Sequence, residues 1–442
     1  MDHRDAALER AETAARTGYG RLLALLAAGT HDIAGAEDAL ADAFERALRR
    51  WPVDGVPTRP EAWLLTVARH RQRDRWRSAE VSRTSGLDPE RDAPAHLDDL
   101  DVDAVPDRRL ELMLVCAHPA VAPPARTPLM LNTVLGYTAE QVARIHAVPT
   151  ATMATRLTRA KNRVRDNRIP FRIPDRSVLP ERMDATLAAV YGAYVIDWST
   201  GPGERDLPPE SLHLAEVLAE LVPDDPEARG LAALVGLSAA RRSARTADDG
   251  SFVPLSDQDP TRWDADRIAR AHEHLRAAHP HGVLGRYQLE AAVQAVHCAR
   301  ATTGRTDWST LLDLHRSLHA VAPSLGSATA LAAVTAEVDG AVAGLALLDA
   351  LGVLGGTGAP GGTGATGRTG ATARTGATGR TGASGDGGRA ARFQPAWATR
   401  AELLSRAGRR EEAVTAYQRA VDLTHTAAER RFLEARRDAL RA

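Results

Sequence analysis

The stretch GYTAEQVARIHAVPTATMATRLTRAKNRVRDN, residues 136 to 167, predicts a helix-turn-helix. Thr138 and Gln141 have the spacing of a capping box, which opens the first of its two helices. Pro149 disfavours helix at the residue before it, and Thr150 is of a type that caps a new helix. Pro128 predicts that the helix preceding this unit begins only there, because a proline inside a helix removes a backbone hydrogen bond.

The second of these helices has two distinct faces. At helical spacing, an apolar set is expected to be buried: Met153, Leu157, Ala160 and Val164. A second set is expected to face outward: Thr152, Arg156, Arg159 and Arg163. Residues 126 to 172 hold nine Lys or Arg against two acidic residues, in a chain of net charge −1. A localised basic face predicts entry into a DNA major groove; the alternative is a solvated helix pair within a helical repeat.

A second basic helix is predicted near the N-terminus. Thr58 and Glu61 form another capping pattern, with Pro60 in the first turn, and the helix is expected to run to about Arg77. Three arginines lie on one stripe beside Trp76, namely Arg69, Arg73 and Arg77. Such a stripe holds phosphates, and an indole stacks on an unpaired base. The alternative is that Trp76 is core and the arginines solvate a helix end.

The segment AGAEDALADAFERALRRW, residues 34 to 51, predicts an amphipathic helix. Its inward face is expected to hold Ala36, Leu40, Phe44 and Ala47. Its outer face carries an acidic stripe of Asp38, Asp42 and Glu45, ahead of Arg46 and Arg49, which favours a basic protein partner. Residues 78 to 106 hold eight acidic residues and three prolines with little apolar periodicity, a composition that predicts a disordered acidic tether.

Two small helical DNA-binding units joined by an acidic tether resemble the extracytoplasmic-function sigma factors of bacterial RNA polymerase, over residues 1 to about 170. The resemblance implies that the chain binds core RNA polymerase and promoter DNA. It places on the polymerase-binding helix Asp38, Asp42, Phe44 and Arg46. It places on the −10 helix Trp63, Arg69, Arg73, Asp74 and Arg77, beside which Trp76 also lies. It places on the −35 helix Thr150, Thr152, Arg156, Arg159 and Arg163.

The C-terminal half resembles the sigma-factor subgroup that carries a long helical-repeat extension. Alanine- and leucine-rich segments recur from Leu179 to Leu351 without sustained strand alternation. One tetratricopeptide-like unit is matched by Trp397, Ala401, Gly408, Ala413, Tyr417, Ala420 and Leu423. Stacked helix pairs provide a concave surface for an unknown protein or peptide partner, or serve as a scaffold.

Residues 355 to 389 interrupt this half with the tandem hexads TGATGR, TGATAR, TGATGR and TGASGD. Glycine recurs at every third position except at Ala373, but Pro360 is the segment's sole proline, which argues against a collagen triple helix. The segment is expected to be a flexible linker with a root-mean-square span of roughly 30 to 35 Å. The last unit can then either swing free or fold back onto the repeats.

Other function classes find little support. No apolar run is long enough to cross a bilayer and no signal-peptide core follows the charged N-terminus, so a cytoplasmic protein without membrane association is expected. Cys116 and Cys298 lie in separate predicted domains, and the four histidines between His272 and His281 are expected to be solvated. We expect no metal, no cofactor and no catalytic residues, because the chain has no nucleophile elbow or phosphate loop.

The sequence thus predicts an all-α protein: two small helical sigma domains, the second a helix-turn-helix, plus a tetratricopeptide-like extension. The expected domains are 1–77, the tether 78–106, 107–170, 175–354, the linker 355–389 and the terminal unit 390–442. The expected function is promoter-directed transcription initiation, with an extension that regulates it. One rival is a helix-turn-helix regulator that binds operators without polymerase and senses a ligand or a partner through its repeats. Other rivals are a repeat scaffold with a vestigial sigma half and, more distantly, an enzyme.

Overall fold

The computed structural model describes residues 3–81, 108–146, 148–175, 177–199, 210–279, 282, 284–352, 391–424 and 426–441. These residues form helices, short 3₁₀ turns and irregular segments, with one isolated bridge between Thr246 and Phe252 in place of any sheet. The all-α prediction is confirmed. The chain divides into two compact units, Met1–Ile196 and Asp197–Ala442, which are described separately.

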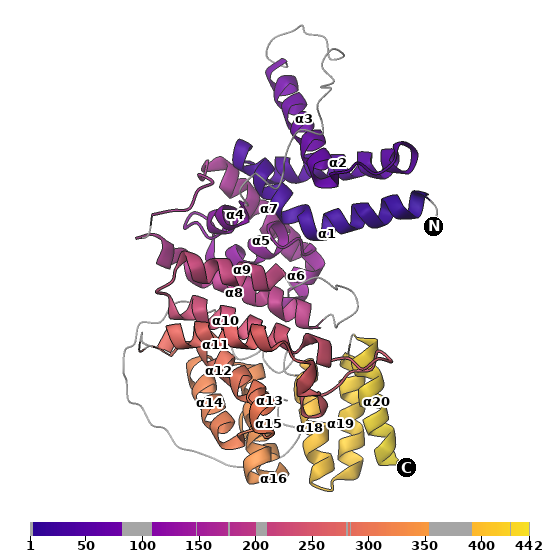
Figure 1. Ribbon diagram of the computed structural model, residues 1–442, viewed down its shortest axis with the longest axis vertical. Helices are drawn as coiled ribbons and strands as arrows, with labels where there is room; N and C mark the ends of the chain where they lie inside the picture. Colours follow the sequence, from indigo (N-terminus) through magenta and orange to yellow (C-terminus); the bar gives the residue numbers. More distant parts are fainter. Residues whose placement is uncertain are drawn as a thin grey trace. The chain divides into compact units, whose positions relative to one another are not determined.

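The first unit opens with three long helices, α1 (His3–Thr30), α2 (Ile33–Asp54) and α3 (Pro60–Val81), which pack on one another (Figure 1). The side chain of Asp32 accepts a hydrogen bond from the backbone N–H of Gly35 at 3.1 Å and so begins α2. Of the inward face expected on α2, Ala36, Leu40 and Ala47 are fully buried and Phe44 is half-buried. Apolar burial on one stripe therefore fixes which face of α2 is left for other contacts.

Helix α3 has Pro60 in its first turn as expected, but it continues to Val81. The predicted helix ended at about Arg77, so its last turn enters the stretch that composition assigned to the tether. Proline is tolerated in the first turn because its missing N–H has no intrahelical acceptor there. The rest of the predicted tether, residues 82 to 106, lies outside the described residues.

The helix-turn-helix consists of α6 (Ala139–Ile145) and α7 (Thr150–Asp166). The capping box is present: Gln141 N donates to Thr138 Oγ1 at 3.2 Å, and Thr138 N donates to Gln141 Oε1 at 2.8 Å. The prediction that Thr150 caps α7 is wrong. Pro149 holds the cap position with an extended backbone, and Thr150 is the first helical residue. The rigid φ of proline begins this helix without help from a hydroxyl.

Helix α4 (Arg109–Cys116) and helix α5 (Pro123–Thr133) precede this pair. The expectation that α5 begins only at Pro128 is wrong, because Pro128 lies buried inside a helix that begins five residues earlier. A proline at this position leaves the carbonyl of Pro124 without its usual backbone donor. The guanidinium of Arg156 donates to that carbonyl at 3.4 Å, so a side chain of α7 replaces the missing bond.

Helix α8 (Leu179–Ser199) packs on α5 and the segments around it rather than beginning a separate domain. Arg182 Nη1 donates to the Leu114 carbonyl at 2.8 Å, and Tyr137 Oη donates to the Ala193 carbonyl at 3.4 Å. Gly192 lies against the side chain of Leu131. The sequence placed the start of the extension at residue 175, whereas the first compact unit includes this helix up to Ile196.

The second unit is a series of helices, each of which packs mainly on the helices that lie next to it in the sequence (Figure 1). Its helices are α9 (Glu210–Leu221), α10 (Pro226–Ala240), α11 (Ala265–Ala278), α12 (Arg286–Cys298), α13 (Arg300–Thr303), α14 (Trp308–Val321), α15 (Leu325–Asp339), α16 (Ala341–Ala350), α18 (Gln394–Arg406), α19 (Arg410–Leu423) and α20 (Ala427–Arg441). Nearest-neighbour contacts of this kind are typical of repeat proteins. The narrower tetratricopeptide assignment stays a prediction.

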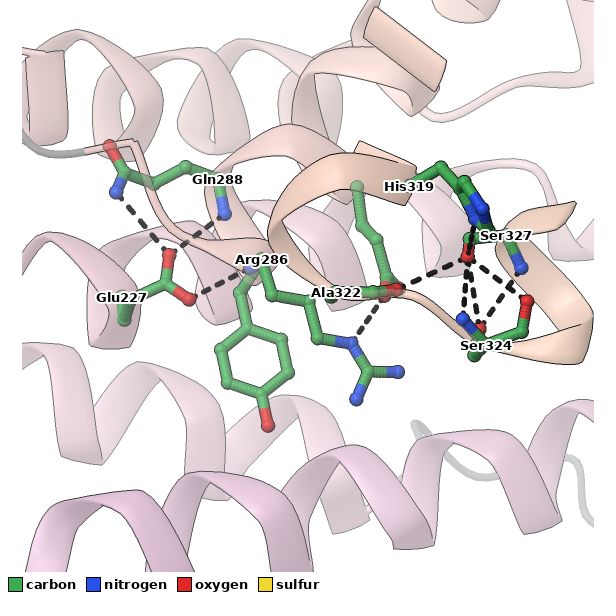
Figure 2. Close-up of polar contacts among 9 residues, drawn as sticks. Glu227, Arg286, Gln288, His319, Ala322, Ser324 and Ser327 are labelled. Carbon is green, nitrogen blue, oxygen red and sulfur yellow. Dashed lines mark hydrogen bonds and ion pairs between the residues drawn. The ribbon is translucent and has the colours of Figure 1, made fainter. Parts of the chain in front are cut away.

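Helices α10 and α12 are joined by a carboxylate that caps a helix other than its own (Figure 2). Glu227 accepts hydrogen bonds from the backbone N–H groups of Tyr287 at 2.9 Å and Gln288 at 3.1 Å. A negative charge is favourable at a helix N-terminus, where N–H groups lack partners. Gly230 permits this approach, because a Cβ there would lie 2.6 Å from the backbone nitrogen of Gln288.

The terminal helices pack back onto α15 and α16. One apolar cluster is shared by Ala336 and Leu345 of α15 and α16 with Ala401, Leu403 and Leu404 of α18. Ion pairs join Arg400 to Asp349 and Arg406 to Glu337. Of the two arrangements that the sequence left open for this unit, the structure has the packed one.

We predict that deleting Gly356 to Gly388 leaves the stability of the chain nearly unchanged. Leu351 and Phe393, which flank the described ends of this segment, pack against the same apolar cluster. After the deletion, Gly352–Gly355 and Arg389–Arg392 remain between them, a connection of eight residues with a reach of roughly 30 Å. The melting temperature checks this, with Ala401→Arg as the control that should lower it by placing a charge in a fully buried position. A large loss of stability in the deletion variant alone would contradict the prediction.

Candidate nucleic-acid and protein interfaces

The outward face of α7 lines a groove of about 730 Å³. The groove lies between α7 and the start of α5 with the loop before it, and it is lined by Pro119, Ala120, Ala122, Ala125, Thr152, Thr155, Arg156, Arg159, Ala160 and Arg163. The apolar set Met153, Leu157, Ala160 and Val164 is buried as expected. Thr152, Arg159 and Arg163 are exposed and Arg156 is half-exposed, and these four line the groove together, whereas Thr150 is exposed but is not among the lining residues.

The three arginines of this groove differ in how they are held. Arg156 donates to the Pro124 carbonyl, and Arg163 Nε donates to the Ala120 carbonyl, both at 3.4 Å. For Arg159, no hydrogen bond or ion pair is found within the described part of the chain. Backbone carbonyl groups therefore orient Arg156 and Arg163. Arg159 instead extends from the middle of the outward face of α7, and its N–H groups are available to a ligand.

Helix α3 divides its arginines between two sides. Arg69 is half-buried, and burial lowers the pKa of its guanidinium, with a smaller contribution from the charge of Arg73. Arg73 and Asp74 are exposed, while Trp63 is half-buried and meets Trp51 edge to face at 5.6 Å. The side chains of Trp76 and Arg77 lie outside the described residues.

The acidic stripe of α2 is engaged by the other arginines of α3. Arg71 Nε lies 2.5 Å from Asp42 Oδ2, and Arg75 Nη1 lies 2.9 Å from Asp38 Oδ2. Arg46 is exposed nearby. Sequence reasoning did not find these pairs, although residues two apart on a helix lie on nearly opposite sides, so alternate arginines cannot all share one face. Exposed pairs of this kind contribute about 0–1 kcal/mol, so a partner can displace them.

A buried ion pair joins α2 to the back of α7. Lys161 Nζ lies 2.6 Å from both carboxylate oxygens of Glu37 and 2.9 Å from Asn132 Oδ1. Burial raises the pKa of the Glu37 carboxyl above its ordinary value, while the charge of Lys161 opposes that shift. Sequence reasoning did not single out these residues, because nothing local in either helix indicates that the two meet.

The described residues were also compared with the requirements for a metal site, a reactive cysteine and a membrane-spanning helix. No group of three or more His, Cys, Asp or Glu side chains gathers there in an arrangement that holds a metal. Cys116 and Cys298 are both buried and unpaired, and burial raises the pKa of the Cys116 thiol to about 12. A buried thiol with a raised pKa is a poor nucleophile. None of the described helices combines the length and the apolar character that crossing a membrane requires.

Comparisons with known proteins bear on both units. Residues 16–81, which include α2, α3 and the second half of α1, match the family described as Sigma-70 region 2. Residues 182–279 match a family of unknown function, DUF6596. The chain is 34% identical over 328 residues to the "Uncharacterized protein R00370" of Rhizobium meliloti (strain 1021), an alignment that spans 72% of this chain and 77% of that protein. No solved structure matches the chain.

The region 2 match covers the helices that carry the acidic stripe of α2 and the arginines of α3. The similarity to the Rhizobium meliloti protein extends over most of both chains. The region 2 match indicates a sigma-70 family factor, and the chain belongs to the same family as the uncharacterized Rhizobium meliloti protein R00370.

Proposed function

We propose that this chain binds core RNA polymerase through α2 and directs it to promoters through α3 and α7, as an extracytoplasmic-function sigma factor. The observation that carries the proposal is the region 2 match over residues 16–81, on helices that expose acidic residues on α2 and arginines on α3. Members of the sigma-70 family are transcription factors. The reaction is then the polymerase's, and the chain supplies recognition.

The helix-turn-helix supports the second half of the proposal. Its recognition helix exposes Thr152, Arg159 and Arg163 beside a groove. Arginine donates to phosphate oxygens and to the base edges of guanine, and a helix of this kind fits the major groove. We assign α7 to −35 DNA and the Arg69 and Arg73 side of α3 to −10 DNA.

The first prediction concerns the acidic stripe. Asp38→Lys with Asp42→Lys should abolish co-purification with core polymerase, because α2 would repel the basic partner that its charge fits. The fold should persist, since the pairs with Arg75 and Arg71 that are lost are exposed. Circular dichroism checks the fold. The matched control is Glu140→Lys, which reverses an exposed acid on α6. A folded double variant that still co-purifies with core enzyme would remove the sigma-factor proposal.

The second prediction distinguishes the roles of the arginines of α7 in DNA binding. Arg159→Ala should relax sequence preference at one promoter position by about 1–3 kcal/mol, because its guanidinium is available to a base edge. Arg156→Ala and Arg163→Ala should instead weaken binding to all sequences and reduce the salt dependence by about one phosphate contact each, since backbone carbonyls hold these side chains to the flank of the groove. Binding to a randomised −35 element across a salt series measures both quantities. The assignment fails if Arg159→Ala retains the wild-type sequence preference.

The region that matches the family of unknown function is proposed to act on DNA binding through α8. Its match begins at Arg182, the residue whose guanidinium donates to the Leu114 carbonyl. Thr127 Oγ1 donates to the Ala185 carbonyl at 3.3 Å, which adds a second tie between α5 and α8. A movement of α8 that the extension causes would therefore be transmitted to α4 and α5, and α5 packs against α7.

The third prediction compares two truncations. A chain that ends after Pro174 lacks α8 and should lose stability of its helix-turn-helix and promoter output, because apolar side chains such as Leu131 would be exposed. A chain that ends after Ser199 retains α8 and should keep the helix-turn-helix folded. Hydrogen exchange over α4 to α7 and run-off transcription measure the difference. Equal protection and equal output in the two truncations would show that α8 is dispensable.

A further inference from the structure

The wall of the groove that faces α7 is rich in proline. Residues 119 to 128, PAVAPPARTP, contain four prolines and form the loop before α5 together with the first turns of that helix. Proline has no backbone N–H, so such a segment offers carbonyl groups that its own backbone does not satisfy. Two of these carbonyls, those of Pro124 and Ala120, accept hydrogen bonds from Arg156 and Arg163 of α7.

Pro128 differs from the other prolines of this segment. Pro123 and Pro124 occupy the first two positions of α5, where a missing N–H has no intrahelical acceptor. Pro128 lies buried inside the helix, where an N–H would donate to the Pro124 carbonyl. The ring of an interior proline also crowds that carbonyl and moves it away from the helix axis. Pro128 therefore leaves the Pro124 carbonyl to a donor from another helix, and Arg156 supplies it.

The place of Arg156 on α7 is one from which a side chain can read bases. Of the three arginines in the groove it is the nearest to the N-terminus of the helix, six residues after Thr150. In a helix-turn-helix, the N-terminal part of the second helix contacts base edges. Arg156 and Arg159 are three residues apart and so lie on the same side of α7. The contact with α5 is what distinguishes the two side chains.

This contact is close to the limit of hydrogen bonding. The distance from Arg156 Nη1 to the Pro124 carbonyl oxygen is 3.4 Å, so a small movement of the carbonyl toward the axis of α5 would break it. The same guanidinium lies near the turn between α6 and α7. Burial lowers the pKa of His146 in that turn, and the charge of Arg156 lowers it further. The pKa of His146 therefore reports where the Arg156 guanidinium lies.

We propose that Pro128 is a positioning residue that decides which arginines of α7 read base edges. It frees the Pro124 carbonyl, the carbonyl holds Arg156 against α5, and base reading by the groove arginines is thereby restricted to Arg159. The proposal rests on the proposed function for its DNA step. A residue with an N–H at position 128 would return the carbonyl to the backbone ladder of α5 and release Arg156 to the DNA.

The first arm of the test uses the free full-length protein. Pro128→Val restores the N–H with a comparable apolar side chain, and Pro128→Ala restores it with a smaller one. The amide that each introduces should be protected from hydrogen exchange by the Pro124 carbonyl. The pKa of His146, measured by NMR, should rise in both variants and in Arg156→Ala, because a positive charge leaves the turn. Pro123→Ala, an exposed change at the first position of α5, is the matched control and should leave this pKa unchanged.

The second arm uses the full-length chain with core polymerase on duplexes that carry a randomised −35 element. Pro128→Val should add a preference of about 5- to 100-fold at one further base pair, which is the discrimination that one base-reading arginine provides. It should also reduce the salt dependence by about one phosphate contact. Adding Arg156→Ala should remove the new preference. Arg163→Ala should have the same effect with and without Pro128→Val, because the Ala120 carbonyl that holds Arg163 precedes α5.

Several outcomes would overturn the proposal. One is an unchanged pKa of His146 in both variants at position 128, and another is an unchanged −35 preference once that pKa has risen. A new preference that persists after Arg156→Ala would assign it to another residue. Unfolding of both variants, seen as a lost melting transition, would show that Pro128 serves the fold instead. If the wild-type chain does not bind core polymerase or −35 DNA, the proposed function fails, and the free-protein arm still decides whether Pro128 positions Arg156.

Discussion

The arrangement of the first unit depends on satisfying one buried ammonium group. Lys161 lies on the flank of α7, where the packing of α2 largely removes it from water. A charge in that position is costly unless it is paired and hydrogen bonded. Glu37 and Asn132 supply the acceptors, and in doing so they fix the register of α2 against α7. Burial raises the pKa of the Glu37 carboxyl, and the charge of Lys161 opposes that shift. Because removing two charges from water offsets much of their attraction, a pair of this kind selects one geometry more than it stabilises the fold.

In the same unit, helical periodicity places neighbouring charged residues of one helix on different faces. The arginines of α3 alternate between pairing with the acidic residues of α2 and facing away from them, as Arg71 and Arg73 illustrate. On α7, Lys161 and Arg159 point to nearly opposite sides for the same reason. One helix can then contribute both to internal packing and to an outward basic face. The proposed DNA-binding faces consist of the basic side chains that lie outside these ion pairs.

In the second unit, close approach of helix backbones positions neighbouring helices. Gly230 and Gly344 allow neighbouring helices nearer than any side chain would permit, with Cβ clearances below 3 Å. Glu227 then caps the helix that has approached it. The helices on both sides of residues 353 to 390 contribute to a shared apolar cluster, so the repeat stack is continuous in space although its sequence is interrupted.

The sequence by itself determined the helical class, the capping box at Thr138 and the buried face of α7, because each depends on residues within one or two turns of each other. It misjudged Pro128 because local rules assume that a lost backbone bond is not replaced, whereas Arg156, 28 residues after Pro128, contacts the freed carbonyl. It misjudged Thr150 because the rigid backbone of Pro149 begins α7 without a hydroxyl cap. Only the tertiary structure decided that Glu37 meets Lys161, that α8 packs on the helix-turn-helix core and that the terminal helices fold back. These contacts join residues far apart in sequence, and helical periodicity specifies which face is apolar but not which partner covers it.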